Sequence, residues 1–259
     1  MKGKVLVLMS GGIDSAVTAW IAGEEYSKLY ALTFRYGQSH CKEVECALQL
    51  GLRLGVERHK VLDLPISDMG GSSLFAKEEI PMVGVEGIPT TWVPQRNSIF
   101  LAIAFGWAEV LGCERVYIGA NVVDYSGYPD CRPEFIESMN IALNFASKKW
   151  IETGRGVDIR TPLMFRTKRD IIELGRGLRV PFENTWSCYR GEEKACGLCP
   201  SCQIRLKGFK EAGIGDPIGY SCAACGLEVK NPEIYVDCSM PVYAIGLPYH
   251  SKCLEEHII

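Results

Sequence analysis

The feature that most constrains the fold is an apolar run, Lys4-Val5-Leu6-Val7-Leu8-Met9, that ends abruptly in Ser10-Gly11-Gly12-Ile13-Asp14-Ser15. A short, continuous apolar run is typical of a strand that is buried on both faces of a parallel sheet. The two glycines allow the backbone to turn tightly and to approach a ligand closely. We predict a strand, a loop and a helix to about Glu24, with Ser15 as the helix cap. The free N–H groups of such a helix favour an anion, most simply phosphate.

The spacing of this loop differs from that of the Walker loop, because no Lys-Ser or Lys-Thr pair closes a GxxxxG frame. The segment Ser10–Ser15 resembles instead the pyrophosphate loop of the N-type ATP pyrophosphatases. Members of that superfamily adenylate a carboxyl or carbonyl group and release pyrophosphate. The alternative is an ordinary glycine-rich turn after a sheet strand.

Composition limits the partners of the chain. With 259 residues, of which 47% are hydrophobic, it can form one large domain, alone or with a small appendage. A net charge of −3 gives no electrostatic basis for direct binding to nucleic acid. The first residues lack the apolar core of a signal peptide, and no apolar stretch approaches the ~18 residues that span a bilayer. We therefore expect a cytoplasmic protein with no membrane partner.

Strand and helix patterns alternate along the chain. Further strands are predicted at Lys28–Phe34, Arg58–Leu64, Glu114–Ala120 and Asp158–Leu163, and helices at Glu43–Leu54, at Asn97–Leu111 and after Phe165. This order predicts an α/β fold with a Rossmann-like parallel sheet and helices on both faces. In such sheets ligands bind beyond the carboxyl ends of the strands. The long segment Pro65–Gln95 is either a lid over the substrate or a surface excursion.

Several polar residues follow these strands. Arg96 is unfavourable for the dipole of a helix that begins there, so contact with an anion is the better reason for its presence. The segment Asn121–Phe135 is rich in polar, aromatic and turn residues, which suits a pocket for a flat heterocycle, with carboxylates facing the N–H donors of a guanine. The alternative is that Asp130 or Arg132 only satisfies the following helix. Lys168 either reaches nucleotide phosphates or is solvated.

The chain contains 12 cysteines, a high count for a compartment in which disulfides rarely persist. Cys41, Cys46, Cys113 and Cys131 are scattered, and we interpret most of them as small apolar filler. The thiols of Cys188, Cys196, Cys199 and Cys202 are closely spaced in the sequence, which suits tetrahedral zinc. An iron–sulfur cluster, or no metal at all, are the alternatives.

The last part of the chain carries a second set of metal-type residues: Cys222, Cys225, His250 and Cys253. A segment of about forty residues buries too little apolar surface to fold alone, so a second zinc is a reasonable staple, with unligated cysteines as the alternative. We predict three regions: an α/β domain (1–185), a zinc-binding knuckle packed on it (186–220) and a C-terminal extension (221–259).

Taken in order, these motifs resemble the 7-cyano-7-deazaguanine synthase family from about Lys4 to Tyr220. Besides the Ser10–Ser15 loop and the Cys188 cluster, the resemblance rests on Tyr36-Gly37-Gln38-x-His40, Val93-Pro94-x-Arg96-Asn97 and Ser126-Gly127-Tyr128-Pro129-Asp130-Cys131-Arg132-Pro133-Glu134-Phe135. One position departs from it, because the family commonly has Arg where this chain has Ser39. The resemblance implies an ATP-dependent ligase of queuosine biosynthesis that acts on 7-carboxy-7-deazaguanine, takes ammonia as nitrogen donor and forms a homodimer.

The implied chemistry begins when the acid attacks the α-phosphorus of ATP and forms an acyl adenylate. Ammonia gives the amide, and adenylation of the amide oxygen then permits elimination to the nitrile. The resemblance implies that ATP is bound by Ser10, Gly11, Gly12, Asp14 and Ser15, and we expect Met9, Ile13 and Lys168 to complete this site. Mg²⁺ should accompany the ATP, with Asp14 as its protein contact. We expect the substrate to be bound by Tyr36, Gln38, Arg96, Asn97, Asp124, Tyr128, Asp130, Arg132 and Phe135. The catalytic candidates are Asp14, Lys168 and Arg96; Cys131 is a weaker candidate, since buried thiols are usually inert.

Two further functions are compatible with the same residues. A related adenylating enzyme would attach the deazaguanine acid to a protein amine or stop at the amide, with a protein partner recruited by the C-terminal extension. A zinc-containing module that only binds a nucleotide would release no AMP.

Overall fold

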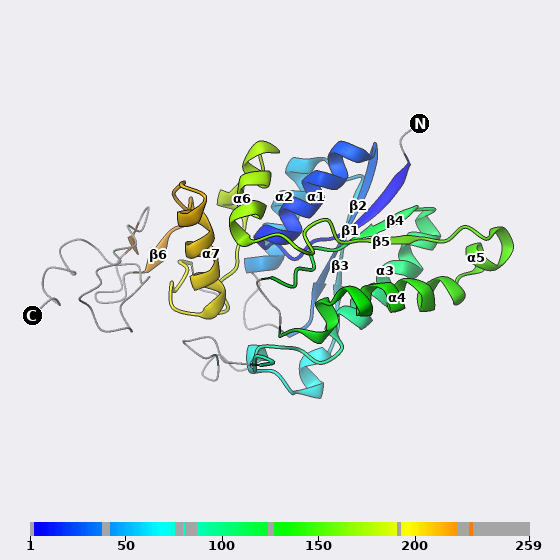
Figure 1. Cartoon of the computed structure of the whole chain (residues 1–259), viewed down its shortest axis with the longest axis horizontal. Coiled ribbons are helices and arrows are strands. Elements are labelled where there is room, and N and C mark those ends of the chain that lie inside the picture. Colours follow the sequence, from blue (N-terminus) through cyan, green and yellow to red (C-terminus); the bar gives the residue numbers. More distant parts are fainter. Residues whose placement is uncertain are drawn as a thin grey trace, which may run out of the picture.

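The computed structural model describes residues 3–37, 42–75, 80, 87–123, 127–190, 193–221 and 228–229. Its centre is a five-stranded sheet in the order β3-β2-β1-β4-β5, and every neighbouring pair is parallel (Figure 1). The strands are β1 (Lys4–Leu8), β2 (Lys28–Arg35), β3 (Arg58–Asp63), β4 (Arg115–Tyr117) and β5 (Asp158–Arg160). The predicted α/β fold with a parallel sheet is therefore confirmed.

Helices cover both faces of the sheet, as predicted (Figure 1). One face packs against α1 (Ile13–Glu25), α2 (Lys42–Leu54) and α6 (Lys168–Gly177), and the other against α3 (Arg96–Leu111) and α4 (Pro133–Phe145). The remaining helices are α5 (Lys148–Thr153) and α7 (Pro200–Glu211), with short 3-10 turns η1 (Ile66–Met69), η2 (Ser73–Phe75), η4 (Pro129–Cys131) and η5 (Phe182–Asn184). None of the helices in the described ranges is long and apolar enough to cross a bilayer.

The apolar run of the first strand explains why the sheet is covered on both sides. Val5 and Val7 pack into the core under α1 and α2, whereas Leu6 and Leu8 pack into the core under α3. Since successive side chains of a strand point to opposite faces, a strand with both faces buried must be apolar throughout. The sequence pattern and the packing agree at this strand.

The strand order creates a switch point between β1 and β4. From β1 the chain moves outward to β2 and β3, and it then returns to the opposite side of β1 as β4. The loops that follow β1 and β4 therefore leave the sheet in different directions, which opens a crevice at the carboxyl ends of these strands. At Gly119, just beyond β4, a Cβ would lie 2.9 Å from the carbonyl carbon of Asp14, so the start of α1 packs directly on this segment.

Some local predictions need correction. The helix cap predicted at Ser15 is wrong: α1 begins at Ile13, its N-cap is Gly12, and no side chain caps it. Ser15 lies inside the first turn of α1, where its hydroxyl bonds to Ser10 and to the Gly12 carbonyl instead. The fourth and fifth strands are also shorter than the predicted Glu114–Ala120 and Asp158–Leu163, since β4 ends at Tyr117 and β5 ends at Arg160, before a turn over residues 162–165.

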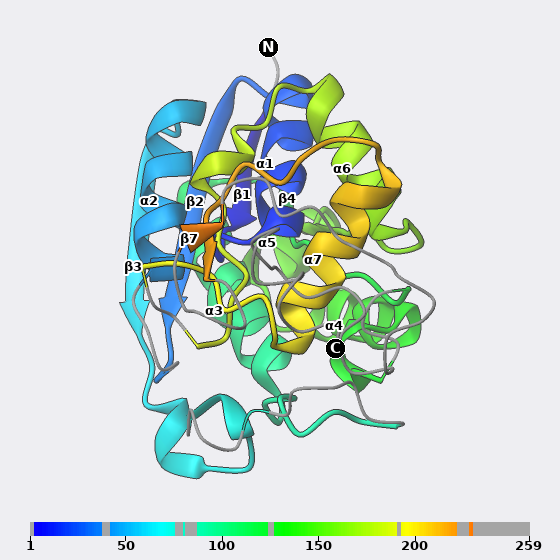
Figure 2. The same cartoon turned by 90° about the vertical axis from the view of Figure 1, so that its left-hand side faces the viewer.

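The cysteine-containing segment packs over the carboxyl end of the sheet, opposite the end at which β1 begins (Figures 1 and 2). It has a small apolar core of its own, to which Trp186, Leu206, Ile218 and Tyr220 contribute together with the buried cysteines. β6 (Tyr220–Ser221) pairs antiparallel with β7 (Glu228–Val229). The predicted second metal ligands Cys222, Cys225, His250 and Cys253 lie outside the described residues.

Candidate active site

The loop after β1 is held by its own serines. Ser15 Oγ accepts hydrogen bonds from the Ser10 N–H and the Ser10 hydroxyl, both at 3.1 Å, and donates to the Gly12 carbonyl at 3.0 Å. The Gly12 N–H donates to Ser10 Oγ at 3.3 Å. Ser15 thus organises the loop from within the first turn of α1. The positive end of this helix faces the crevice and favours an anion there.

Gly11 cannot carry a side chain at this position. Its φ of +91° lies in the left-handed region, and a Cβ would overlap the carbonyl oxygen of Glu43 at the start of α2. The close approach of the loop to α2 therefore depends on glycine, for the reason that the sequence indicated.

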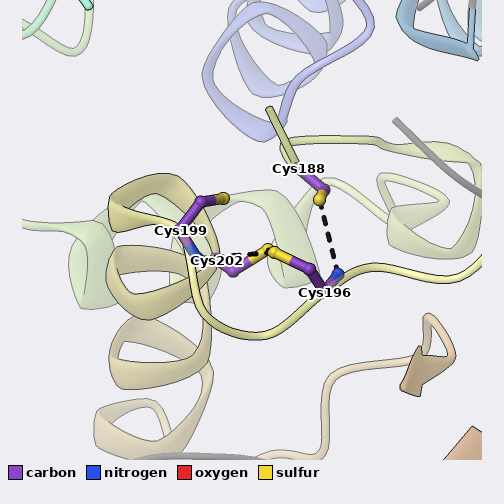
Figure 3. Close-up of side chains that lie close together, drawn as sticks. All are labelled: Cys188, Cys196, Cys199 and Cys202. Atoms are coloured by element: carbon purple, nitrogen blue, oxygen red, sulfur yellow. Dashed lines mark hydrogen bonds between the residues drawn. The ribbon is translucent and has the colours of Figure 1, made fainter. Parts of the chain in front are cut away.

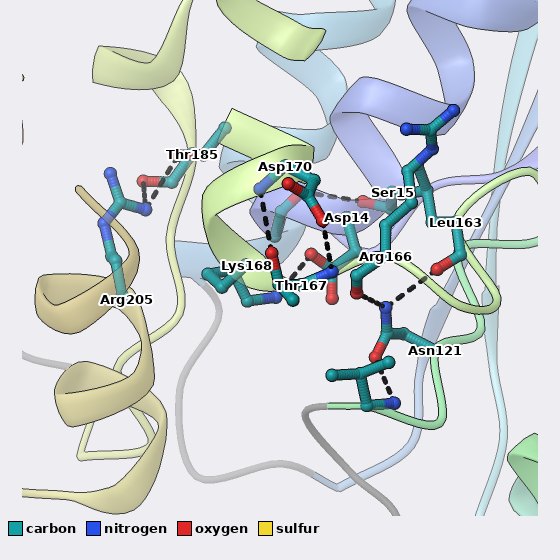
Figure 4. A network of polar contacts seen from close by, with 12 residues as sticks. Asp14, Ser15, Asn121, Leu163, Arg166, Thr167, Lys168, Asp170, Thr185 and Arg205 are labelled. Atoms are coloured by element: carbon teal, nitrogen blue, oxygen red, sulfur yellow. Dashed lines mark hydrogen bonds and ion pairs between the residues drawn. The ribbon is translucent and has the colours of Figure 1, made fainter. Parts of the chain in front are cut away.

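Lys168 reaches the loop from the first residue of α6. Its Nζ lies 2.6 Å from Oδ1 of Asp14, and the side chain of Lys168 is only 8% exposed (Figure 4). The alternative of a solvated lysine is therefore wrong. A capping box fixes the start of α6, with the Thr167 hydroxyl accepting from the Asp170 N–H and the Asp170 carboxylate accepting from the Thr167 N–H. The cation and the loop are thus brought together by two distant parts of the sequence.

Asn121 fixes the segment that leads to Lys168. Its side-chain amide donates to the carbonyls of Leu163 at 2.8 Å and Arg166 at 2.6 Å, and its Oδ1 accepts from the Val123 N–H (Figure 4). The end of β4 is therefore bound to the connection between β5 and α6. The sequence analysis does not single out Asn121 as a site residue, although its position shortly after a predicted strand is a signal for one.

A cavity of about 230 Å³ opens beside the loop. It is lined by predicted nucleotide-site residues, namely Met9, Ser10, Gly12, Ile13, Asp14, Ser15 and Lys168, and by the predicted substrate-site residues Tyr36, Arg96, Asn97 and Tyr128. A concave site with a few convergent polar groups is the usual form of a small-molecule site. Most of the predicted residues therefore meet in one cavity.

Arg96 and Tyr36 form the charged part of the substrate side. Arg96 Nη1 lies 3.5 Å from the Tyr36 hydroxyl, and its guanidinium lies 6.0 Å from the centre of the Tyr36 ring. Burial disfavours the charged form of Arg96, but Tyr36, Tyr128 and Asp130 outweigh this effect and raise its pKa. Burial also raises the pKa of the Tyr36 hydroxyl. Arg96 is therefore a permanent cation beside a neutral phenol, an arrangement suited to a carboxylate.

Asp130 has a structural task in this arrangement. One carboxylate oxygen accepts from Trp92 Nε1 at 3.2 Å, and the other accepts from the Asn97 N–H at 3.0 Å. Asp130 therefore accepts a hydrogen bond from a free N–H group in the first turn of α3, which precedes Asp130 in the chain. It does not cap α4, the helix that follows it. This carboxylate also offsets the unfavourable position of Arg96 at the start of α3.

Other predicted substrate residues are not brought to the cavity. Arg132 and Phe135 line a separate depression with Phe165, so their assignment to the substrate stays a prediction. Gln38 and Asp124 lie outside the described residues.

The sequence analysis missed Glu43, which lines the cavity from the first turn of α2. Burial raises the pKa of its carboxyl to about 7, against the opposing effect of Arg96. Glu43 lies shortly after the Tyr36–His40 motif, and this position was the sequence signal that could have indicated a site residue.

The four thiols of the knuckle converge. The Sγ atoms of Cys188, Cys196, Cys199 and Cys202 all lie within 4.8 Å of one another, and those of Cys196 and Cys202 are 4.0 Å apart (Figure 3). A tetrahedral zinc with Zn–S distances of about 2.3 Å places sulfur atoms about 3.8 Å apart, so the cluster fits such an ion. Hydrogen bonds from Cys188, Cys199 and Cys202 lower the pKa of the Cys196 thiol far below its usual range. The donor set therefore suits a closed, structural metal site.

The knuckle is bound to the nucleotide loop. The Trp186 N–H donates to the Gly11 carbonyl at 2.9 Å, two residues before Cys188. In α7, the absence of a side chain at Gly208 leaves room for the stem of Lys168. The segment that carries the four cysteines therefore contacts both the Ser10–Ser15 loop, through Trp186, and Lys168, through α7.

A parallel sheet in this order, with a glycine-containing loop and a helix N-terminus at its switch point, defines an α/β protein of the Rossmann-like class with an anion-binding loop. The chain carries in addition a four-cysteine site packed against that loop. It belongs to the family described as "Queuosine biosynthesis protein QueC", whose model matches residues 4–213.

Relatives support this assignment. The chain is 46% identical over 220 residues to the 7-cyano-7-deazaguanine synthase of Xanthomonas axonopodis pv. citri (strain 306), covering 84% of this chain and 98% of the relative. It is 44% identical over 223 residues to the enzyme of the same name from Xanthomonas campestris pv. campestris (strain B100), covering 85% and 99%. Among solved structures, the NMN synthetase from Francisella tularensis superposes with a TM-score of 0.45 at 17% identity, over 82% of this chain and 78% of that one.

Proposed function

We propose that this protein is an ATP-dependent ligase that converts 7-carboxy-7-deazaguanine and ammonia to 7-cyano-7-deazaguanine, with release of AMP and pyrophosphate. The observation that carries the proposal is the meeting of Lys168 and the Ser10–Ser15 loop beside the Arg96 pocket, in a chain of the QueC family. The loop and Lys168 would hold the phosphates of ATP, and Arg96 would hold the acid's carboxylate. The carboxylate would then lie next to the α-phosphorus that it attacks.

Each charged group has a defined part in this proposal. Lys168 acts on the phosphates as a point charge, and the α1 N-terminus stabilises the charge that develops on them. Oδ1 of Asp14 is bound to Lys168, whereas Oδ2 accepts no hydrogen bond from the part of the chain that the structure describes. This free oxygen fits a contact to the Mg²⁺ that accompanies ATP. Zinc in the four-cysteine site would hold the knuckle that supports the loop.

The test is incubation of the protein with ATP, ammonia and the acid, followed by mass spectrometry of the products. Free nitrile together with AMP and pyrophosphate is the expected result. An end product at the amide, or an adduct on a protein amine, would favour the related adenylating enzyme with a protein acceptor. Formation of ADP alone, or no AMP with any deazapurine acid, would refute the adenylation itself.

Three further parts of the proposal depend on separate measurements. Metal analysis of anaerobically purified protein is expected to give zinc at the Cys188 cluster, whereas stoichiometric iron with sulfide would contradict it. A homodimer is expected by sedimentation. Truncation after Tyr220 is expected to lower the zinc content if Cys222, Cys225, His250 and Cys253 hold a second ion.

A further inference from the structure

Glu43 is an acidic group in the cavity that the proposed function leaves without a task. It stands in the first turn of α2, and its backbone carbonyl packs against Gly11. Its side chain lines the same cavity as Ser10, Arg96 and Tyr36. Glu43 is therefore fixed beside the loop at which the α-phosphate, and with it the reacting carbon, would lie.

The other acidic groups near this cavity already have hydrogen-bond partners, and Oδ2 of Asp14 is assigned to Mg²⁺ in the proposed function. Oδ1 of Asp14 is held by Lys168 at 2.6 Å, and both oxygens of Asp130 accept hydrogen bonds, from Trp92 and from Asn97. By contrast, the Glu43 carboxylate forms no hydrogen bond or ion pair within the described ranges of the chain. A carboxylate in a cavity without a hydrogen-bond partner favours a small ligand that donates hydrogen bonds.

We propose that Glu43 binds ammonium next to the adenylate and accepts its proton, so that ammonia is released as the nucleophile. This role rests on the proposed ligase function. Ammonia dissolved at neutral pH is almost entirely ammonium, which has no free electron pair, so a reaction with ammonia needs a proton acceptor at the site. The charged or titratable neighbours of Glu43 are Arg96 on α3, Tyr36 after β2, Cys46 on α2 itself and Cys188 of the knuckle.

One N–H bond of ammonium breaks and its proton passes to an oxygen of Glu43, which leaves a free electron pair on nitrogen. That pair forms the C–N bond to the acyl carbon, while the C–O bond to AMP breaks and its electron pair leaves with AMP. A second proton leaves the nitrogen for solvent and gives the amide. A carboxyl pKa near 7 suits such an acceptor, because the group can both take and return a proton at neutral pH.

A competing task for Glu43 is to bind the N–H donors of the guanine ring. The geometry argues against it, since those donors are on the six-membered ring and point away from the carboxyl group that reacts. Glu43 packs against the loop where this carboxyl group would be activated, and so lies at the wrong end of the substrate for that contact.

The experiment compares Glu43→Gln with Glu45→Gln, an exposed position on the same helix. Acid-dependent exchange of labelled pyrophosphate into ATP, measured without ammonia, reports adenylation alone, and we expect it to be unchanged in both variants. The kcat/KM for ammonia is expected to fall about 100-fold or more in Glu43→Gln only. Hydroxylamine is largely unprotonated at neutral pH, so capture of the adenylate as a hydroxamate should be retained.

Three results would overturn the role of Glu43. They are an unchanged kcat/KM for ammonia in Glu43→Gln, a parallel loss of pyrophosphate exchange and hydroxamate, or a rise confined to the KM for the acid. Unfolding temperatures show whether both variants are folded, and Glu43→Asp, which keeps the carboxylate, should recover part of the activity with ammonia. If the unaltered protein itself showed no acid-dependent exchange, both the proposed function and the role of Glu43 would be wrong. If only the comparison of the variants failed, the role of Glu43 alone would be wrong.

Discussion

Replacing Asp216 by alanine is expected to destabilise the protein strongly, because this residue compensates a fully buried arginine. Asp216 accepts from Arg205 Nε at 2.6 Å and Nη2 at 2.8 Å, from the Tyr220 hydroxyl at 2.6 Å and from the Ile218 N–H at 3.3 Å. The side chains of Arg205 and Asp216 are each 1% exposed. Removal of one partner of a buried pair costs about 3–5 kcal/mol, and the orphaned Tyr220 hydroxyl adds about 1–3 kcal/mol.

The chain provides a matched control. Arg35 and Asp63 form an ion pair with the same 2.6 Å separation, but their side chains are 45% and 72% exposed. Because water screens such a pair, Asp63→Ala should lower the free energy of unfolding by no more than about 1 kcal/mol. The two replacements are chemically identical and differ in burial.

The assay is urea denaturation of the variants at equal, saturating zinc, followed by fluorescence. Asp216→Ala should lose at least about 4 kcal/mol, a large part of the about 5–15 kcal/mol by which domains are usually stable. Replacing both partners, as Arg205→Met with Asp216→Leu, should restore most of the loss, since apolar residues leave no buried charge. If Asp216→Ala and Asp63→Ala differed by less than 1 kcal/mol, the argument from burial would be refuted.

Three further predictions concern the site. Lys168→Met should abolish most acid-dependent pyrophosphate exchange, measured against Arg169→Met on the exposed side of the same helix and under conditions in which unfolding curves show both variants to be folded; equal activity of the two would contradict the role of Lys168. Cys202→Ser should lower the zinc content and also weaken ATP binding by calorimetry, because the knuckle supports the loop through Trp186; full ATP affinity without metal would count against this coupling. Burial raises the pKa of the Cys131 thiol to about 11, so little of it is thiolate at pH 8. Peptide mapping of native protein treated with iodoacetamide at this pH should show slow labelling of Cys131, and rapid labelling of Cys131 would contradict the shielding.

The sequence determined those features that depend on neighbouring residues. The continuous apolar run of β1 required a strand buried on both faces, and Gly11 required a left-handed turn at its end. The spacing from Cys188 to Cys202 was sufficient to indicate a metal site, since its ligands come from one short segment. Such patterns act over a few residues, so they survive in any tertiary context.

Only the tertiary structure decided which distant residues meet. Lys168 is paired with Asp14 because β4 lies beside β1, and the strand order depends on the packing of helices on both faces. The same packing bound Asp130 to the start of α3 and left the Glu43 carboxylate in the cavity without a hydrogen bond from the described residues. Burial, and with it the pKa of a carboxyl group, depends on segments far away in the chain. A linear pattern of residues does not contain that information.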